Sequence, residues 1–236
     1  MKKLLSVFLI AFAIFLFIGL FVYFRSFSRM GSSGRDLKVI QWIRNPQSRG
    51  NWAVKGNQRC ENAPFLMPTD GYIGYLWDDS FRVGHRHQGI DIFSGTEPGI
   101  IPVVAAYDGY LNRMGDWKSS LIIRIPQDPL QMDSQIWTYY THLADEDGVS
   151  LISAEFPPGT QEVFVKAGTF LGYQGNYSGT PGNPVGVHLH FSIVQDDGTG
   201  KFKNELEIEN TMDPSPYLQM NLNARTNEGD IPKCKE

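Results

Sequence analysis

Turn residues interrupt the sequence from Pro64 onwards so often that no long amphipathic helix is predicted there. The chain contains 24 glycines and 14 prolines, and both residue types mark turns. Between the turns lie short runs rich in β-branched and aromatic residues, at residues 72–77, 89–93, 101–107, 110–114, 121–125, 136–142, 162–165 and 187–194. Short strands at this spacing are typical of antiparallel sheets and sandwiches. We therefore predict an all-β domain built on an antiparallel sheet.

The last of these runs carries two histidines one residue apart, His188 and His190. Because strand side chains alternate between two faces, both imidazoles are expected on one face. Leu189 and Phe191 then point the opposite way, into a core. Histidine is the commonest metal ligand and the side chain that titrates near neutral pH. This strand therefore has the form of a metal or catalytic site, with an apolar back and a polar front.

A second cluster, His-Gln-Gly-Ile-Asp at residues 87–91, offers an imidazole and a carboxylate four residues apart. In a strand, positions 87, 89 and 91 face the same way, and Gly89 leaves space between the two polar side chains. With one imidazole from residues 188–190, the cluster makes a set of three ligands. Three protein ligands and an open fourth position are typical of catalytic zinc, whereas structural zinc usually has four.

The order of these motifs resembles that of the M23 peptidases, the lysostaphin and LytM-type zinc endopeptidases of bacterial cell walls. The motifs are His-x-Gly-x-Asp at residues 87–91, Tyr-x-His-Leu at 140–143 and His-Leu-His-Phe at 188–191. Similar intervening elements are found at residues 102–109, 165–175 and 213–218. The resemblance extends over residues 64–218, and several motifs in one order are far more specific than any one of them.

This resemblance implies that His87, Asp91 and His190 bind a zinc ion and that His142 and His188 are catalytic. It also implies the activity of a zinc-dependent metalloendopeptidase that hydrolyses peptide bonds of peptidoglycan. One catalytic histidine would take the proton of the attacking water, and the other would donate a hydrogen bond to the developing oxyanion. Which histidine has which role stays open.

Four further features bear on the expected site. His85 falls outside the family pattern and is expected at the rim of the site or as a plain surface histidine. Tyr140 should share a strand face with His142, where it would orient that ring or contact substrate, and ordinary strand packing is the alternative. Residues 145–156 and 176–186 depart from the family pattern and bear on specificity. The second of these segments is expected to form a wall of the cleft.

Residues 4–24 form an uncharged, largely apolar run that is long enough to cross a bilayer as a helix. A cleavable signal peptide is the alternative, but its apolar core is typically ~7–15 residues and ends at a small-residue site. Here the run ends in bulky aromatic residues, so we predict an uncleaved transmembrane anchor over residues 1–25. A peptidoglycan substrate implies a single-pass protein of the cell membrane whose catalytic domain faces the cell wall or periplasm.

The remaining segments complete the expected domain organisation. Residues 26–63 form a linker and an N-terminal extension, within which residues 37–43 are a short strand or a helical turn. The peptidase domain is expected over residues 64–218, followed by a polar, loosely held tail at residues 219–236. Cys60 and Cys234 flank the domain and either form a disulfide, in an oxidising compartment, or remain two free thiols.

Charge narrows the function classes. A net charge of −4 argues against nucleic-acid binding, which needs a clustered basic surface.

Two other functional hypotheses stand beside that of an endopeptidase. The first is a non-catalytic wall-binding or regulatory module on the same fold, although a degenerate copy would be expected to lack part of a residue set that is complete here. The second is a latent enzyme in which residues 37–63 cover the cleft.

Overall fold

A computed structural model describes residues 34–80 and 84–235 of the chain. The transmembrane anchor expected over residues 1–25 lies outside these ranges. None of the helices that the structure describes has the length and apolar character needed to cross a membrane.

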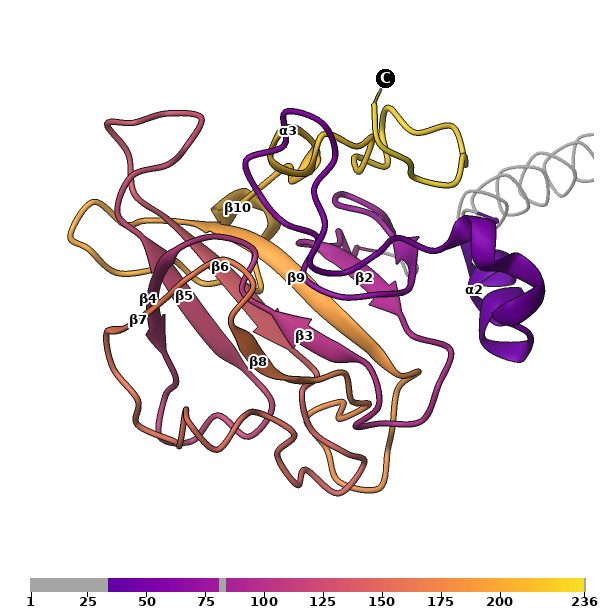
Figure 1. The fold of residues 1–236 in the computed structure, drawn as a ribbon, viewed down its shortest axis with the longest axis horizontal. Coiled ribbons are helices and arrows are strands. Elements are labelled where there is room, and N and C mark those ends of the chain that lie inside the picture. Colours follow the sequence, from indigo (N-terminus) through magenta and orange to yellow (C-terminus); the bar gives the residue numbers. More distant parts are fainter. Residues whose placement is uncertain (1–33, 81–83, 236) are drawn as a thin grey trace, which may run out of the picture.

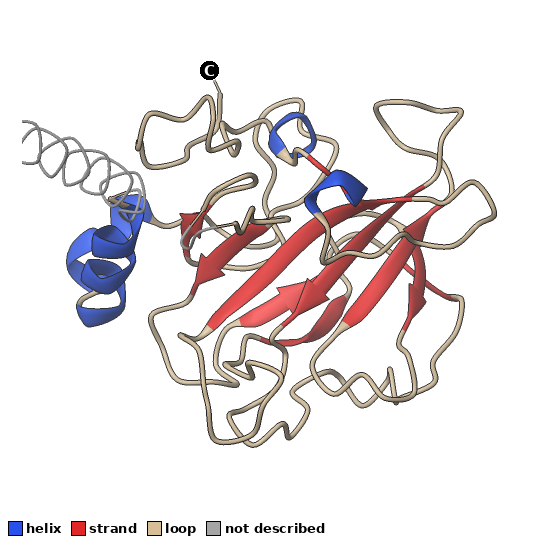
Figure 2. Cartoon of the chain, turned by 180° about the vertical axis from the view of Figure 1, so that it is seen from behind, coloured by secondary structure: helices blue, strands red, loops and turns tan. Residues whose placement is uncertain are grey.

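An eight-stranded sheet forms the body of the molecule, with the helices at its margins (Figures 1 and 2). Its strands follow the order β1-β2-β9-β6-β5-β4-β7, with β10 paired to β9, and all of these pairs are antiparallel. The bounds are β1 (Tyr72–Tyr75), β2 (Ile90–Phe93), β4 (Gly109–Asn112), β5 (Leu121–Ile125), β6 (Ile136–Thr141), β7 (Val163–Val165), β9 (His188–Gln195) and β10 (Thr211–Met212). The strands β3 (Pro102–Val104) and β8 (Phe170–Tyr173) form a separate antiparallel pair. The predicted antiparallel, all-β architecture is confirmed.

The main core lies against the face of β9 that the sequence predicted to be apolar. Leu189, Phe191 and Ile193 are fully buried there. They belong to one cluster with Val103 of β3 and Leu171 of β8, so the small sheet covers this face of the large one. Because side chains alternate along a strand, the opposite face of β9 is left for the two histidines. The predicted role of Leu189 and Phe191 as core anchors is confirmed.

Within residues 34–80 and 84–235, four helical segments accompany the sheets: α2 (Arg35–Arg44), η1 (Gln47–Trp52), η2 (Ile208–Asn210) and α3 (Ser215–Leu218). Residues 37–43 are part of the ten-residue helix α2, so of the two alternatives the helix is right and the short strand is wrong, and the helix is longer than the single turn expected. Val39 and Trp42 of α2 are buried against Tyr72 and Phe93 at the edge of the sheet. The Trp42 ring also donates a hydrogen bond to the Phe93 carbonyl oxygen at 2.7 Å. These apolar contacts stabilise the helix more than its intrinsic propensity does.

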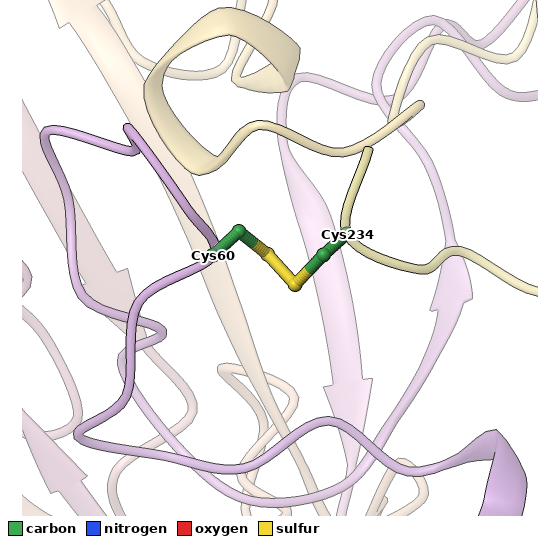
Figure 3. The surroundings of a disulfide bond; sticks show 2 residues. All are labelled: Cys60 and Cys234. Atoms are coloured by element: carbon green, nitrogen blue, oxygen red, sulfur yellow. A yellow bond between two sulfur atoms is a disulfide. The ribbon is translucent and has the colours of Figure 1, made fainter. Parts of the chain in front are cut away.

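The C-terminal tail is held firmly against the domain, contrary to the expectation of a loose tail. Cys60 and Cys234 form a disulfide, so the first of the two interpretations for these cysteines is confirmed (Figure 3). Met220 and Leu222 are buried in the main core. The physical reason is that the polar tail contains apolar residues that cover the core near α3, and the disulfide fixes its far end.

Loss of this disulfide is expected to destabilise the folded chain. The bond joins residues 174 positions apart, and a cross-link that closes a long loop lowers the entropy of the unfolded chain. Replacing both Cys60 and Cys234 by serine should lower the free energy of unfolding by about 2–5 kcal/mol. Denaturant titration of the full chain measures this change. Wild-type protein titrated with reductant present should match the double variant, and an unchanged midpoint in both would contradict the prediction.

Candidate active site

Three neighbouring strands bring the predicted site residues together. Asp91 of β2 is paired with His190 of β9, and Thr141 at the end of β6 is paired with His190 from the other side. His142 follows β6 directly, and His188 begins β9. Antiparallel register therefore gathers residues that are up to 103 positions apart in the chain. All five predicted residues line a single cavity of about 700 Å³.

The three predicted ligands direct their donor atoms at one another. His87 Nε2 lies 3.1 Å from Asp91 Oδ1 and 3.0 Å from His190 Nδ1, and His190 Nδ1 lies 2.9 Å from Asp91 Oδ1. A tetrahedral zinc ion holds its nitrogen and oxygen ligands about 3.3 Å apart. Imidazole and carboxylate groups are also ligands that zinc accepts. The donor set therefore fits a zinc ion, and no second trio of this kind is found among residues 34–80 and 84–235.

Backbone contacts fix His87 just before β2 begins. Its N–H donates to the Asp79 carbonyl oxygen, and its own carbonyl oxygen accepts from the Asp78 N–H, both at 2.8 Å. The ring Nδ1 lies 2.9 Å from the Leu76 carbonyl oxygen. A carbonyl oxygen only accepts, so Nδ1 carries a proton, and Nε2 is the ring nitrogen that faces Asp91.

The structure corrects the expectation that residues 87, 89 and 91 share one strand face. Strand β2 starts only at Ile90, so strand alternation does not place His87. The structure also gives Gly89 a different role from leaving space between the ligands. A Cβ added to Gly89 would lie 2.2 Å from the Phe191 carbonyl oxygen. Glycine therefore allows the chain to pass close to β9 before it enters β2.

Electrostatics favour the charged form of Asp91. Burial raises the pKa of its carboxyl, but the neighbouring imidazoles, His87 first among them, outweigh burial and lower that pKa well below the usual value. The Asp91 carboxylate in turn raises the pKa of His87. Burial lowers the pKa of His190. One carboxylate beside imidazole nitrogens is a donor set that attracts a divalent cation.

The two predicted catalytic histidines face each other beside this trio. Their ring centroids are 4.3 Å apart. His142 Nδ1 lies 2.7 Å from the Tyr177 carbonyl oxygen, and His188 Nδ1 lies 2.6 Å from the Gly186 carbonyl oxygen. Each Nδ1 therefore carries a proton, and each Nε2 carries a lone pair. Burial lowers the pKa of both rings, that of His188 to about 4, so both are neutral at neutral pH.

A backbone turn directs His142 into the cavity. Its φ is +70°, in the left-handed region that residues other than glycine seldom adopt. Strand alternation consequently stops at Thr141, and Tyr140 does not share a face with His142. Tyr140 is fully buried, and its hydroxyl accepts a hydrogen bond from the Ala106 N–H at 2.9 Å. Strand packing, the alternative interpretation for Tyr140, is confirmed.

Several cavity residues were not predicted from the sequence. Tyr139 donates to Ser120 Oγ at 3.0 Å, and Ser120 Oγ lies 2.7 Å from Thr141 Oγ1, which forms a chain of hydroxyl groups along one side. Val39 and Ile43 of α2 line another side. These hydroxyl groups meet because of the register of β5 with β6, and no short sequence motif predicts that register.

The residues that line the cavity also test two weaker predictions. His85 also lines the cavity, with its ring centroid 6.4 Å from that of His87, so it lies near the site and is not a distant surface histidine. The expectation that residues 176–186 form a wall of the cleft is confirmed. The residues of this segment that line the cavity are Tyr177, Ser178, Gly179, Val185 and Gly186.

No protein-family model matches the chain, and no curated protein matches its sequence. Three solved structures of bacterial proteins illustrate what it is similar to. Helicobacter pylori Csd3 is 18% identical over 59% of this chain and 33% of its own, with a TM-score of 0.37. A putative glycyl-glycine endopeptidase LytM from Ruminococcus gnavus is 29% identical over 55% of this chain and 44% of its own, with a TM-score of 0.36. The catalytic domain of the antimicrobial peptidase lysostaphin from Staphylococcus simulans is 23% identical over 63% of this chain and 90% of its own, with a TM-score of 0.39. The chain thus spans less than half the length of the first two proteins.

Proposed function

We propose that this chain, which has an M23 peptidase-like fold, is a zinc metalloendopeptidase that hydrolyses peptide bonds of bacterial peptidoglycan. The observation that carries this function is the convergence of His87, Asp91 and His190 beside two neutral histidines in one cavity. A ligand trio next to acid–base groups is the arrangement that metal-assisted hydrolysis needs.

The three ligand atoms of the site would be His87 Nε2, Asp91 Oδ1 and His190 Nδ1. When bound, zinc supplies Lewis acidity, which activates water and polarises the scissile carbonyl. Asp91 contributes the only negative charge of the trio, so the site keeps a net positive charge and its electrophilic character. The Leu76 carbonyl oxygen, 2.9 Å from His87 Nδ1, fixes the tautomer and the orientation of that ring.

His142 and His188 would move the protons. In its neutral form, either ring can accept a proton from the attacking water at Nε2 and return it to the leaving amine. Both Nδ1 protons are already donated to backbone carbonyls. A hydrogen bond from either ring to the oxyanion therefore requires a proton at Nε2. Proton uptake from water by one ring supplies that donor at the moment when charge develops on the substrate.

The wider organisation follows from the same proposal. Residues 64–218 would carry the peptidase motifs, with α2 and the C-terminal tail packed onto them, and the apolar run within residues 1–25 would anchor the domain in the cell membrane. Peptidoglycan lies outside that membrane, so the domain faces the cell wall or periplasm. Nothing in the charge balance favours a nucleic-acid partner.

Metal removal tests the proposed function. The full chain is expected to contain about one zinc ion and to release peptide fragments from isolated peptidoglycan. A chelator should abolish the release, and added zinc should restore it. Mass spectrometry of the fragments identifies the bond that is cut. Binding to peptidoglycan without release of fragments would favour the non-catalytic module, and activity that persists in excess chelator would exclude a metal mechanism.

A further inference from the structure

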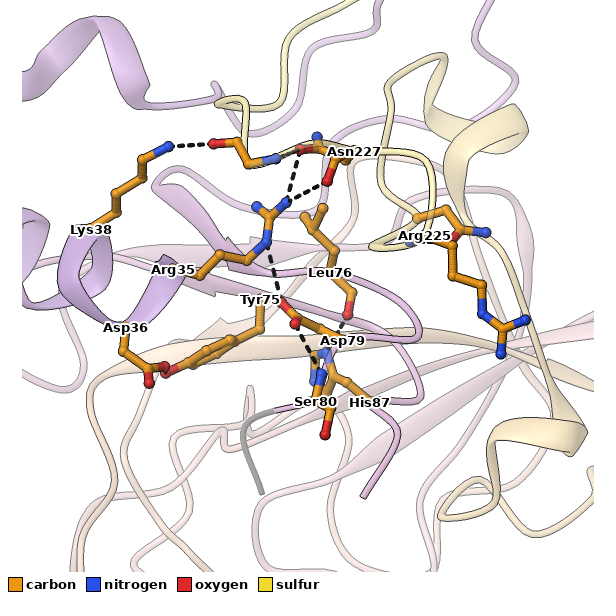
Figure 4. Close-up of polar contacts among 12 residues, drawn as sticks. Arg35, Asp36, Lys38, Tyr75, Leu76, Asp79, Ser80, His87, Arg225 and Asn227 are labelled. Carbon is orange, nitrogen blue, oxygen red and sulfur yellow. Dashed lines mark hydrogen bonds and ion pairs between the residues drawn. The ribbon is translucent and has the colours of Figure 1, made fainter. Parts of the chain in front are cut away.

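Polar contacts hold the first turn of helix α2 in place (Figure 4), and residues of this helix line the proposed catalytic cavity. Arg35 forms a buried ion pair with Asp79, at 3.3 Å between Nε and Oδ2, and it donates to Asn227 Oδ1 at 2.8 Å. The Tyr75 hydroxyl donates to Asp36 Oδ1 at 2.5 Å. These contacts tie the first turn of the helix to β1, to the loop that precedes His87 and to the C-terminal tail. Its last turn is held by the hydrogen bond from the Trp42 ring.

One face of this helix forms part of the cavity wall. Val39 and Ile43 lie one turn apart, on the same side of α2, and both line the cavity. Across from them is Gly186, where an added Cβ would lie 3.4 Å from Ile43 Cδ1 and 3.4 Å from Phe93 Cε1. Val185 completes this corner of the cavity. The corner is therefore lined by aliphatic and aromatic carbon from three separate segments.

This apolar corner adjoins a proposed catalytic group. The Phe93 ring stacks on the His188 ring, with centroids 4.8 Å apart and planes inclined by 24°. The Gly186 carbonyl oxygen holds His188 Nδ1. A peptide whose scissile bond lies beside His188 would therefore bring the side chain of a flanking residue to the corner.

We propose that α2, Phe93 and Val185 form an apolar subsite that favours a peptide with an aliphatic side chain beside the scissile bond over one with glycine there. This inference rests on the proposed endopeptidase function. Ile43 and Val185 are 43% and 37% exposed, so substrate contact would remove apolar surface from water. Val39 and Ile43 line the cavity and leave about 700 Å³ of it unfilled, so α2 is placed as a wall of the cavity, whereas a latent enzyme would need a cover.

Matched peptides test the subsite on the full chain. Once product analysis has identified the cut bond, pairs of peptides are compared that carry alanine or glycine at each residue flanking it. The wild type should prefer the alanine peptide at one position by about tenfold in kcat/KM, as expected for one methyl group in an apolar pocket. The Ile43→Ser variant should reduce that ratio to about twofold. Val185→Ser, on the opposite wall, should reduce it similarly.

Ile40→Ser is the matched control, because Ile40 lies on the same helix, is 46% exposed and does not line the cavity. It should keep the wild-type ratio. Equal ratios in the Ile40→Ser and Ile43→Ser variants would overturn the subsite, and so would faster cleavage of both peptides by Ile43→Ser, which would favour latency instead. The affinities of the same peptides for the zinc-loaded His142→Ala variant provide a second readout. If the wild type cleaved neither peptide but the His142→Ala variant still bound the alanine peptide more tightly than the glycine peptide, the result would count against the proposed function and not against the subsite.

Discussion

His142→Ala and His142→Asn are expected to retain zinc and to lower cleavage of peptidoglycan by about 10²–10⁴-fold. His142 is not part of the ligand trio, but its ring faces His188 with 4.3 Å between centroids. Loss of the imidazole removes one of two groups that can move protons at the scissile bond. Asparagine tolerates the left-handed backbone at this position better than alanine does, so it separates lost chemistry from backbone strain. Zinc content and the rate of fragment release measure the two effects.

His85→Ala provides the control for these variants, since it removes an imidazole that lines the same cavity but is not one of the five predicted site residues. Its cleavage rate should stay within about threefold of the wild type, because surface substitutions away from the reacting groups have small effects. Equal losses in the His85 and His142 variants would mean that the second motif does not supply a catalytic group. Full cellular function of the His142 variants would favour the non-catalytic module.

The apolar back of β9 and the gathering of the five site residues follow from patterns that a sequence displays. Strand alternation alone places Leu189 and Phe191 in the core and both histidines on the other face. The pairing of Asp91 with His190 depends on the register of β2 with β9, whereas the resemblance implied only that both residues bind one zinc ion. Alternation fails at His142, whose positive φ is not encoded by any turn residue. Tyr140 was misplaced for that reason.

Helix α2 and the tail could not be predicted because their stability comes from distant contacts. The buried side of α2 includes Arg35, and a charged residue hides the apolar periodicity by which a helix is recognised. Its partner Asp79 lies beyond the extension, and its partner Asn227 lies 192 residues further along the chain. The tail contains few apolar residues, yet two of them, Met220 and Leu222, complete the core. Only the folded chain shows that these segments belong to the domain.

Asp91→Asn is expected to weaken zinc binding by more than about 100-fold. Loss of a residue that only hydrogen-bonds to a metal ligand costs about 10–100-fold in affinity, and loss of a ligand itself should cost more. The substituted side chain would keep the shape of the original but lose the one negative charge among the three donors. His87 and His190 would then converge on a neutral amide, and the burial of both rings leaves little water to compensate for the missing charge. Cleavage should fall in proportion to the zinc that is lost. Titration with zinc, followed by metal analysis of the dialysed protein, measures the affinity.

Glu205→Gln is the matched control, because Glu205 lines the same cavity but is not one of the convergent ligands. Both substitutions remove one carboxylate charge from the cavity, so any effect of net charge alone should be equal in the two variants. If proximity to the imidazoles is what matters, only Asp91→Asn loses the ion. Retained zinc in Asp91→Asn, or its loss in Glu205→Gln, would assign the metal to other side chains. We expect only Asp91→Asn to lose zinc, because the three donor atoms of the trio lie about 3 Å apart. A dissolved cation gains most where several donors are already gathered.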